Sequence, residues 1–263
     1  MTDQPDRRFT STGRLLGAEG VSRLRQAHVV VVGIGGVGSW ASEALARSGV
    51  GRLTLIDLDQ IVESNINRQV HALESTLGAA KVDVMARRIQ QIAPLALVTA
   101  IEAFVEPDNL DALMPKKASV VIDAIDAVRA KAALVSWCVN HELPVIVCGA
   151  AGGRSDPLRL QCEDLARTSG DSLLSSLRLR LRRDYGFPAA GTGGKDLARA
   201  RRFSVQAIFS SERASGASPG GDDSGRTGGA PLACAGYGSI VTVTASMGMA
   251  AAARAIDTIL AAR

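Results

Sequence analysis

Residues Val29–Gly38 (VVVVGIGGVG) decide the fold, because they join a buried strand to a glycine-rich turn. Four β-branched residues in succession are typical of a strand covered on both faces, as in a parallel sheet. Gly33, Gly35 and Gly38 then follow the spacing G-x-G-x-x-G, in which glycines permit a tight turn and a close approach of the backbone to a phosphate. The next residues read as a helix whose amino end offers free N–H groups to an anion. With Gly36 as a fourth glycine, the stretch predicts a nucleotide site.

The rest of the chain alternates between strand and helix patterns. Strands are expected near residues 28–32, 52–57, 97–101, 119–123 and 144–148, and helices near 38–48, 78–93, 108–114 and 129–141. This order predicts an α/β fold, a doubly wound and mostly parallel Rossmann-like sheet with a smaller C-terminal part. We divide the 263 residues into an N-terminal arm and helix (1–27, with Phe9 and Arg14 in the arm), a nucleotide-binding α/β domain (28–155) and a C-terminal part (156–263) that packs on the same domain.

Polar residues after the glycine turn indicate which nucleotide is bound. Asp57 ends the second strand, 24 residues after the first glycine of the turn, where an acidic side chain meets a ribose hydroxyl in such folds. Arg68 and Lys81 supply the fixed cations that suit a triphosphate being cleaved, because charge develops on its phosphoryl oxygens. The segment Asp123–Asp126 puts a carboxylate at the end of a strand, where it could hold Mg²⁺. Each residue also has an ordinary alternative, since acids cap helices and cations lie on surfaces.

With these motifs the chain resembles the adenylating enzymes related to ubiquitin-activating E1 proteins and their bacterial sulfur-carrier counterparts, the ThiF, MoeB and HesA type. The resemblance is strongest to one branch, the tRNA threonylcarbamoyladenosine dehydratases, and covers nearly the whole chain outside residues 185–230. The matching stretches include Arg8–Phe9, Gly33–Ser48, Asn65–His71, Asp123–Ala133, Gly149–Gly153 and Cys234–Gly248. The resemblance implies a doubly wound fold, usually dimeric, that uses ATP to cyclise the threonylcarbamoyl group on adenosine 37 of certain tRNAs.

The resemblance also implies roles for individual residues. ATP would contact the glycine turn, the two acids that follow the second strand and three polar residues beyond them, namely Gly33, Gly35, Gly36, Gly38, Asp57, Asp59, Asn65, Arg68 and Lys81. Asp126 would hold Mg²⁺ near the α-phosphate, and Arg14 would reach across a homodimer into the partner's site. The expected catalytic residues are therefore Arg14, Arg68, Lys81 and Asp126. Sulfur-carrying relatives use a loop cysteine near the position of Cys234, but dehydration requires no sulfur, so we assign Cys234 no catalytic role.

Positive charge is concentrated in the C-terminal part. Between Arg167 and Arg213 there are ten Lys and Arg residues and four acids, whereas the whole chain has a net charge of +4. Such a segment is typical of a site for a polyanion such as tRNA, although a solvated helix face gives the same pattern. The candidate nucleic-acid-binding residues are Arg178, Arg180, Arg182, Arg183, Lys195, Arg199, Arg201 and Arg202. Within it, Leu177–Arg182 alternates like a strand, while the neighbouring leucines recur at helical intervals, so the element type stays open.

Several features bear on location and on what is absent. Four cysteines without C-x-x-C spacing argue against structural zinc and favour a reducing, cytoplasmic location, as does the lack of a secretory leader. Residues 211–230 are rich in Gly and Ser and are expected to form a mobile loop. Residues 227–253 carry no charge, but their small and hydroxylated side chains favour a packed helix over a membrane span. His71 is expected to be structural, and Trp40 and Trp137 to lie in the core.

Other functions share part of this pattern. Activation of a small sulfur-carrier protein would use the same ATP residues, although the missing zinc cysteines and the basic segment count against it. An NAD-dependent oxidoreductase or a non-catalytic nucleotide-binding module would use the same glycine turn. Recognition of tRNA would involve a splayed anticodon loop rather than duplex grooves. Whether a sulfur-relay protein docks on the chain stays open.

Overall fold

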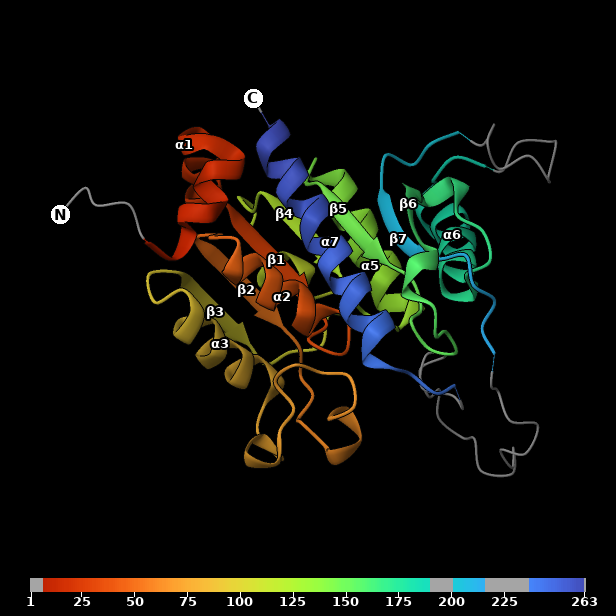
Figure 1. Ribbon diagram of the computed structural model, residues 1–263. Coiled ribbons are helices and arrows are strands. Elements are labelled where there is room, and N and C mark those ends of the chain that lie inside the picture. Colours follow the sequence, from red (N-terminus) through yellow and green to blue (C-terminus); the bar gives the residue numbers. More distant parts are fainter. Residues whose placement is uncertain (1–6, 190–200, 216–236, 263) are drawn as a thin grey trace.

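The computed structural model describes residues 7–189, 201–215 and 237–262, which form a seven-stranded sheet with helices on both faces (Figure 1). The strand order is β3-β2-β1-β4-β5-β7-β6. The strands are β1 (His28–Val32), β2 (Arg52–Ile56), β3 (Leu97–Ile101), β4 (Val120–Asp123), β5 (Val145–Cys148), β6 (Leu160–Asp164) and β7 (Gln206–Ser210). All neighbours are parallel except β6, which runs antiparallel to β7. The predicted doubly wound, mostly parallel sheet is confirmed.

The helices divide between the two faces of the sheet. The α-helices are α1 (Thr10–Gln26), α2 (Gly38–Arg47), α3 (Lys81–Ile92), α4 (Leu110–Leu113), α5 (Val128–Asn140), α6 (Ser172–Tyr185) and α7 (Val241–Ala261). Short 3-10 turns are η1 (Arg7–Phe9), η2 (Glu63–Asn65), η3 (Glu74–Thr76), η4 (Pro157–Arg159) and η5 (Leu165–Arg167). Val30 and Val32 of β1 pack with α5 and α6, whereas Val29 and Val31 pack with α2, α3 and α7. The four valines are therefore all buried because alternate residues serve two cores.

Helix α7 packs beside α2 on one face of the sheet (Figure 1). It contains residues 241–253 of the uncharged segment that a hydropathy scan could mistake for a membrane span. A Cβ on Gly248 would lie 2.5 Å from the carbonyl oxygen of Val37, so the two helices approach too closely for a larger side chain. Its small residues thus serve internal packing. No helix within the described ranges is both long and apolar enough to cross a membrane.

The structure corrects or resolves several local expectations. The placement of Phe9 and Arg14 in an arm before the helix is wrong: Phe9 ends η1, and Arg14 lies in α1, which is kinked at Gly17. Gly17 adopts a φ of 73°, which divides α1 into two short helical pieces. The first piece was not predicted because its glycines and polar residues give no helical pattern. The segment Leu177–Arg182 is helical, because it lies in α6. Strands β6 and β7 were not predicted. Most of the expected loop 211–230, with Cys234, lies outside the described residues.

Candidate functional site

The glycine turn lies at the carboxyl end of β1, where β2 and β4 flank it on either side. Gly33 has a φ of 86°, and a Cβ there would lie 2.9 Å from the backbone of Ala124. A Cβ on Gly38 would lie 1.8 Å from the carbonyl oxygen of Gly33, so both glycines are required by the fold itself. A Cβ on Gly35 would meet nothing within 4 Å. The absence of a side chain at Gly35 therefore leaves open space over the turn, which suits the close approach of a phosphate.

Asp57 joins the end of β2 to this turn. Its Oδ2 accepts a hydrogen bond from the backbone N–H of Ile34 (2.6 Å), and its Oδ1 accepts one from the N–H of Asp59 (2.8 Å). Burial raises the pKa of Asp57, while the nearby Lys81 and the two N–H groups act in the opposite direction. The side chain remains partly exposed beside the turn, in the position where a ribose would lie in a doubly wound fold.

Asn65 and Arg68 lie in the segment between β2 and α3, and Arg68 contacts the glycine turn. Asn65 is buried, and its Oδ1 accepts a hydrogen bond from the N–H of Val62 (3.2 Å), which closes the local turn. The stem of Arg68 lies over the glycine turn, since a Cβ on Gly36 would be 3.4 Å from its Cγ. Its guanidinium donates to the carbonyl of Ser64 (2.6 Å), and its own carbonyl accepts from Nε1 of Trp40 (3.0 Å). Trp40 is only half-buried and is hydrogen-bonded to this segment, so the prediction that it lies in the core is wrong.

Lys81 is the first residue of α3, and its side chain is 7% exposed. Its Nζ lies 2.7 Å from Oδ2 of Asp59, whose side chain is 54% exposed, and its backbone N–H donates to the carbonyl of Asp59 (3.1 Å). The ion pair therefore fixes the position of the Lys81 ammonium, and the exposed carboxylate of Asp59 can be solvated by water if the pair opens. A phosphate could replace Asp59 as its partner without leaving a buried charge unpaired.

Asp126 follows β4 in the loop that contacts the glycine turn, and a buried ion pair supports this loop. Lys131 and Asp123 both have fully buried side chains, with Nζ 2.9 Å from Oδ1, and Nζ also donates to the carbonyl of Ile125 (2.8 Å). Burial raises the pKa of Asp123 and Lys131 opposes it. No role was predicted for Lys131 from the sequence. Its position as the one lysine in the largely apolar α5 was a sign that its charge would need a buried partner. Asp126 itself is half-buried and follows Ile125, whose backbone lies against Gly33 of the turn.

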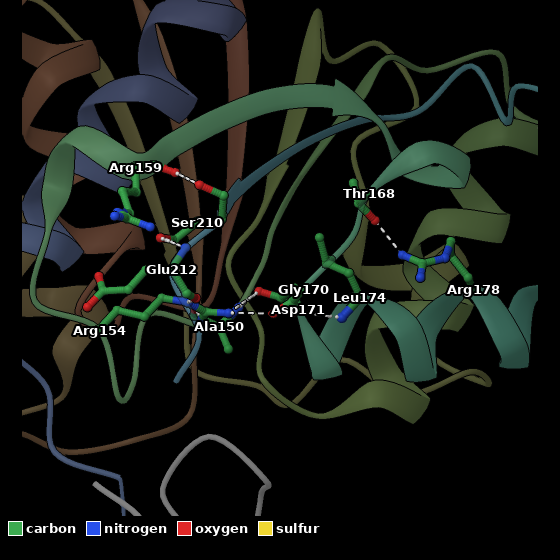
Figure 2. Close-up of polar contacts among 11 residues, drawn as sticks. Ala150, Arg154, Arg159, Thr168, Gly170, Asp171, Leu174, Arg178, Ser210 and Glu212 are labelled. Carbon is green, nitrogen blue, oxygen red and sulfur yellow. Dashed lines mark hydrogen bonds and ion pairs between the residues drawn. The ribbon is translucent and has the colours of Figure 1, made fainter. Parts of the chain in front are cut away.

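A second buried ion pair fixes the loop that follows β5, at the same edge of the sheet (Figure 2). Nη2 of Arg154 lies 3.1 Å from Oδ2 of Asp171, and both side chains are almost completely buried. Arg154 also donates to the carbonyl oxygens of Ala150 and Glu212. The other carboxylate oxygen of Asp171 accepts from the N–H of Leu174 (2.9 Å) and so caps α6. Residues 149–154 are therefore fixed at the edge of the sheet at which the glycine turn also lies. Neither residue of this pair was predicted from the sequence to have a role.

The basic residues of α6 serve different purposes. Arg178 is half-buried, and its guanidinium donates to the hydroxyl of Thr168 (Figure 2). Burial lowers the pKa of Arg178 and of Arg182, and Arg182 lies over the ring of Phe203, 5.2 Å from its centroid. Arg180 and Arg183 pair with Asp184 at the surface. Arg201 and Arg202 are exposed, whereas Lys195 and Arg199 lie outside the described residues. The fold itself therefore uses Arg178 and Arg182.

Arg14 does not meet the other candidates within one chain. It is exposed on α1, whose end is tied to the amino end of β2 by a hydrogen bond from the N–H of Gly51 to the carbonyl of Leu24 (3.0 Å). The glycine turn lies at the opposite, carboxyl edge of the sheet. As for metals, no group of three or more His, Cys, Asp or Glu side chains within the described ranges could hold an ion. Cys138 and Cys148 are buried thiols, and burial raises the pKa of Cys148 to about 12.

His71 is buried, with 1% of its surface exposed, and neither ring nitrogen has a hydrogen-bond partner in the described part of the chain. Burial lowers the pKa of His71 to about 4, and the charges of Lys81 and Arg88 act in the same direction. The ring is therefore neutral at pH 7.

This neutral ring predicts a specific pH dependence of stability. Between pH 4 and 6.5 the unfolded chain binds a proton at His71 that the folded chain does not, so stability is lost as the pH falls through this range. The loss amounts to up to about 3 kcal/mol by pH 4. Urea unfolding at several pH values should show this slope in the wild type and a flatter one in His71→Leu. Parallel curves for the two proteins would contradict it.

Comparisons with known proteins agree with this geometry. The profile of the ThiF family matches residues 10–262. The chain is 41% identical to the tRNA threonylcarbamoyladenosine dehydratase of Escherichia coli, over 99% of this chain and 96% of the relative. It is 41% identical to the Haemophilus influenzae protein of the same name, over 98% and 95% of the two chains. The solved structure of the E. coli dehydratase in complex with ATP has a TM-score of 0.85 and 41% identity, covering 99% of this chain and 96% of that one.

These relatives confirm the family and the branch to which the sequence motifs pointed, along nearly the whole chain rather than over the nucleotide-binding part alone. The fold of the E. coli dehydratase likewise extends through the C-terminal part. The chain therefore belongs to the ThiF family, in which it resembles the tRNA threonylcarbamoyladenosine dehydratases over nearly its full length.

Proposed function

We propose that this chain uses ATP to dehydrate N6-threonylcarbamoyladenosine at position 37 of tRNA. One set of contacts carries the proposal: Asp57 accepts a hydrogen bond from Ile34 in the glycine turn, and the stem of Arg68 lies against Gly36 in the same turn. Asp59, which donates its N–H to Asp57, forms an ion pair with Lys81. A ribose, a triphosphate and the two cations that it requires fit one edge of the sheet. The names of the relatives and the ATP complex of the E. coli dehydratase support the same activity.

The chemistry follows from the leaving group. The threonyl carboxylate attacks the α-phosphorus of ATP, pyrophosphate leaves, and the carboxyl carbon now carries AMP, a far better leaving group than oxide. The neighbouring carbamoyl group attacks this carbon, closes a five-membered ring and expels AMP, which takes away the oxygen lost from the carboxylate. Arg68 and Lys81 stabilise the charge on the phosphates during the first step. The second step needs only positioning, because effective molarities of intramolecular attack reach ~10⁵ M or more.

A magnesium ion fits this arrangement through Asp126. Mg²⁺ in nucleotide sites is usually held by one or two carboxylates together with substrate phosphates and waters. A half-buried carboxylate beside the glycine turn, on a loop fixed by the Lys131–Asp123 pair, matches this requirement. The ion would supply additional neutralisation of the phosphate charge.

A homodimer would complete the site. Arg14 lies at the wrong edge of the sheet to reach the nucleotide of its own chain, but it is exposed next to Leu15, whose side chain is 82% exposed. A two-fold dimer could place Arg14 of each chain in the partner's site as an arginine finger. We further propose a cytoplasmic location and recognition of the anticodon loop, and a sulfur-relay protein as a further partner. The exposed cations Arg183, Arg201 and Arg202 and the half-buried Arg180 remain candidates for RNA contact.

A mass assay tests the proposed function. The protein is incubated with ATP, Mg²⁺ and tRNA that carries threonylcarbamoyladenosine, and the nucleosides are analysed by mass spectrometry. The modified nucleoside should lose the mass of one water only when ATP is present. Pyrophosphate release without a change in the nucleoside would contradict dehydration and leave adenylation of another carboxylate, such as that of a sulfur-carrier protein.

A further inference from the structure

One cavity among the described residues has no place in the mechanism above. It has a volume of about 1060 Å³ and lies between α2, α3, η1 and the turn around η3. Its polar lining is dominated by guanidinium groups and one imidazole, those of Arg8, Arg47, Arg87, Arg88 and His71. No acidic residue is among the described residues that line it. The cavity is therefore electropositive.

A buried carboxylate fixes two of these arginines. The side chain of Glu43 is 4% exposed, and it accepts hydrogen bonds from Nε of Arg47 (2.8 Å) and Nε of Arg88 (2.7 Å). The two arginine side chains remain 59% and 35% exposed. Glu43 neutralises one of their two charges, and Arg87, which directly precedes Arg88 on α3, adds another. The guanidiniums are thus preorganised and keep a net positive charge toward the cavity.

His71 supplies a second, independent indication of a ligand. His71 is among the residues that line the cavity, yet both ring nitrogens are buried and lack hydrogen-bond partners within the described residues. A buried polar group without a partner is costly, and an apolar ring of the same size would avoid that cost. The neutral imidazole keeps one N–H that could donate a hydrogen bond to a ligand oxygen.

The position of the cavity suggests which ligand this is. Lys81 and Arg88 lie seven residues apart on α3, about 10 Å along the helix axis. His71 follows Arg68 by three residues and feels the charges of both Lys81 and Arg88. The cavity is therefore within reach of a nucleotide strand whose modified base reacts at the ATP site.

We propose that the cavity bounded by Arg47, Arg87, Arg88 and His71 binds a backbone phosphate of the RNA substrate next to the reacting nucleotide. The proposal rests on the proposed function for the identity of the RNA. Arginine and a neutral imidazole N–H are suitable donors to a phosphodiester oxygen, and the contact carries no sequence information. It would fix the register of the strand over the ATP site.

Equilibrium binding of fluorescently labelled tRNA tests this contact. Arg47→Gln/Arg87→Gln keeps the Glu43–Arg88 pair, and we expect it to weaken tRNA binding about tenfold and to reduce the salt slope of log K by about one. The affinity for ATP should not change. Since the contact is to the backbone, tRNA with and without the threonylcarbamoyl group should lose affinity equally. Arg25→Gln, an exposed arginine at the end of α1, is the matched control for bulk charge and should bind as the wild type.

His71→Leu separates a ligand contact from a structural role. It removes two unpartnered buried nitrogens, so its melting temperature at pH 7 should equal or exceed that of the wild type, while tRNA binding weakens severalfold. Wild-type tRNA affinity in both variants would overturn the proposal. So would an altered oligomeric state with unchanged tRNA affinity, which would assign the cavity to a protein interface. The mass assay on the wild type tests the proposed function, whereas these variants test RNA binding alone. A failure of the proposed function can therefore be distinguished from a failure of the phosphate contact.

Discussion

Lys81→Met is expected to reduce the rate of pyrophosphate release by about 10²- to 10³-fold, the usual cost of removing one preorganised donor from a developing oxyanion. Lys81 is 7% exposed at the start of α3, so methionine keeps the packing of the stem and removes only the charge. Its partner Asp59 is 54% exposed and can be hydrated, so no buried charge is left unpaired. The protein should therefore fold normally and lose turnover.

The measurement is a coupled pyrophosphate assay with modified tRNA, together with thermal unfolding of the same preparations. Lys117→Met, an exposed lysine before β4, controls for the loss of a positive charge elsewhere. Arg68→Ala should lose turnover as well, because the Arg68 stem lies over the glycine turn. Wild-type rates in Lys81→Met would remove Lys81 from the phosphate site.

Two inactive variants, Arg14→Ala and Lys81→Met, are expected to regain activity when they are mixed and allowed to exchange subunits. In a mixed dimer, one site combines an intact Lys81 with an intact Arg14 from the partner, and the other site lacks both. Random exchange of equal amounts should therefore restore about a quarter of the wild-type sites. The physical reason is that Arg14 is exposed at the amino edge of the sheet, remote from the glycine turn of its own chain.

Each variant alone, carried through the same exchange protocol, serves as the control and should stay inactive. Size-exclusion chromatography establishes that dimers are present. Absence of recovery in exchanged dimers would show that Arg14 does not act across the interface, and full activity of Arg14→Ala alone would remove it from catalysis.

The sequence predicted the part of the fold that local patterns encode. The valines of β1 and the glycines behind them specify a strand buried on both faces and a turn, and both are present. Strand β6 could not be found, because its residues Leu160–Asp164 are largely polar and exposed and it exists through pairing with β7. The first part of α1 was missed because Gly13 and Gly17 lower helix propensity, and packing overrides it.

The candidate site divides in the same way. Asp57, Arg68 and Lys81 follow one another in a recognisable order, so their order along the chain is enough to predict that they share one site. The pairs Arg154–Asp171 and Lys131–Asp123 depend on side chains that meet only after the strands assemble, and spacing alone does not specify such contacts. The charge excess of the C-terminal part likewise could not show that Arg178 and Arg182 are engaged within the fold.

The most direct test of the account follows oxygen through the reaction. The threonylcarbamoyl carboxylate of the tRNA is labelled with ¹⁸O, the dehydration assay is run with ATP, and the products are analysed by mass spectrometry. If the carboxylate is adenylated at the glycine turn, one labelled oxygen leaves the nucleoside and appears in AMP. Label in inorganic phosphate with formation of ADP, or a nucleoside that keeps both labelled oxygens, would contradict the account.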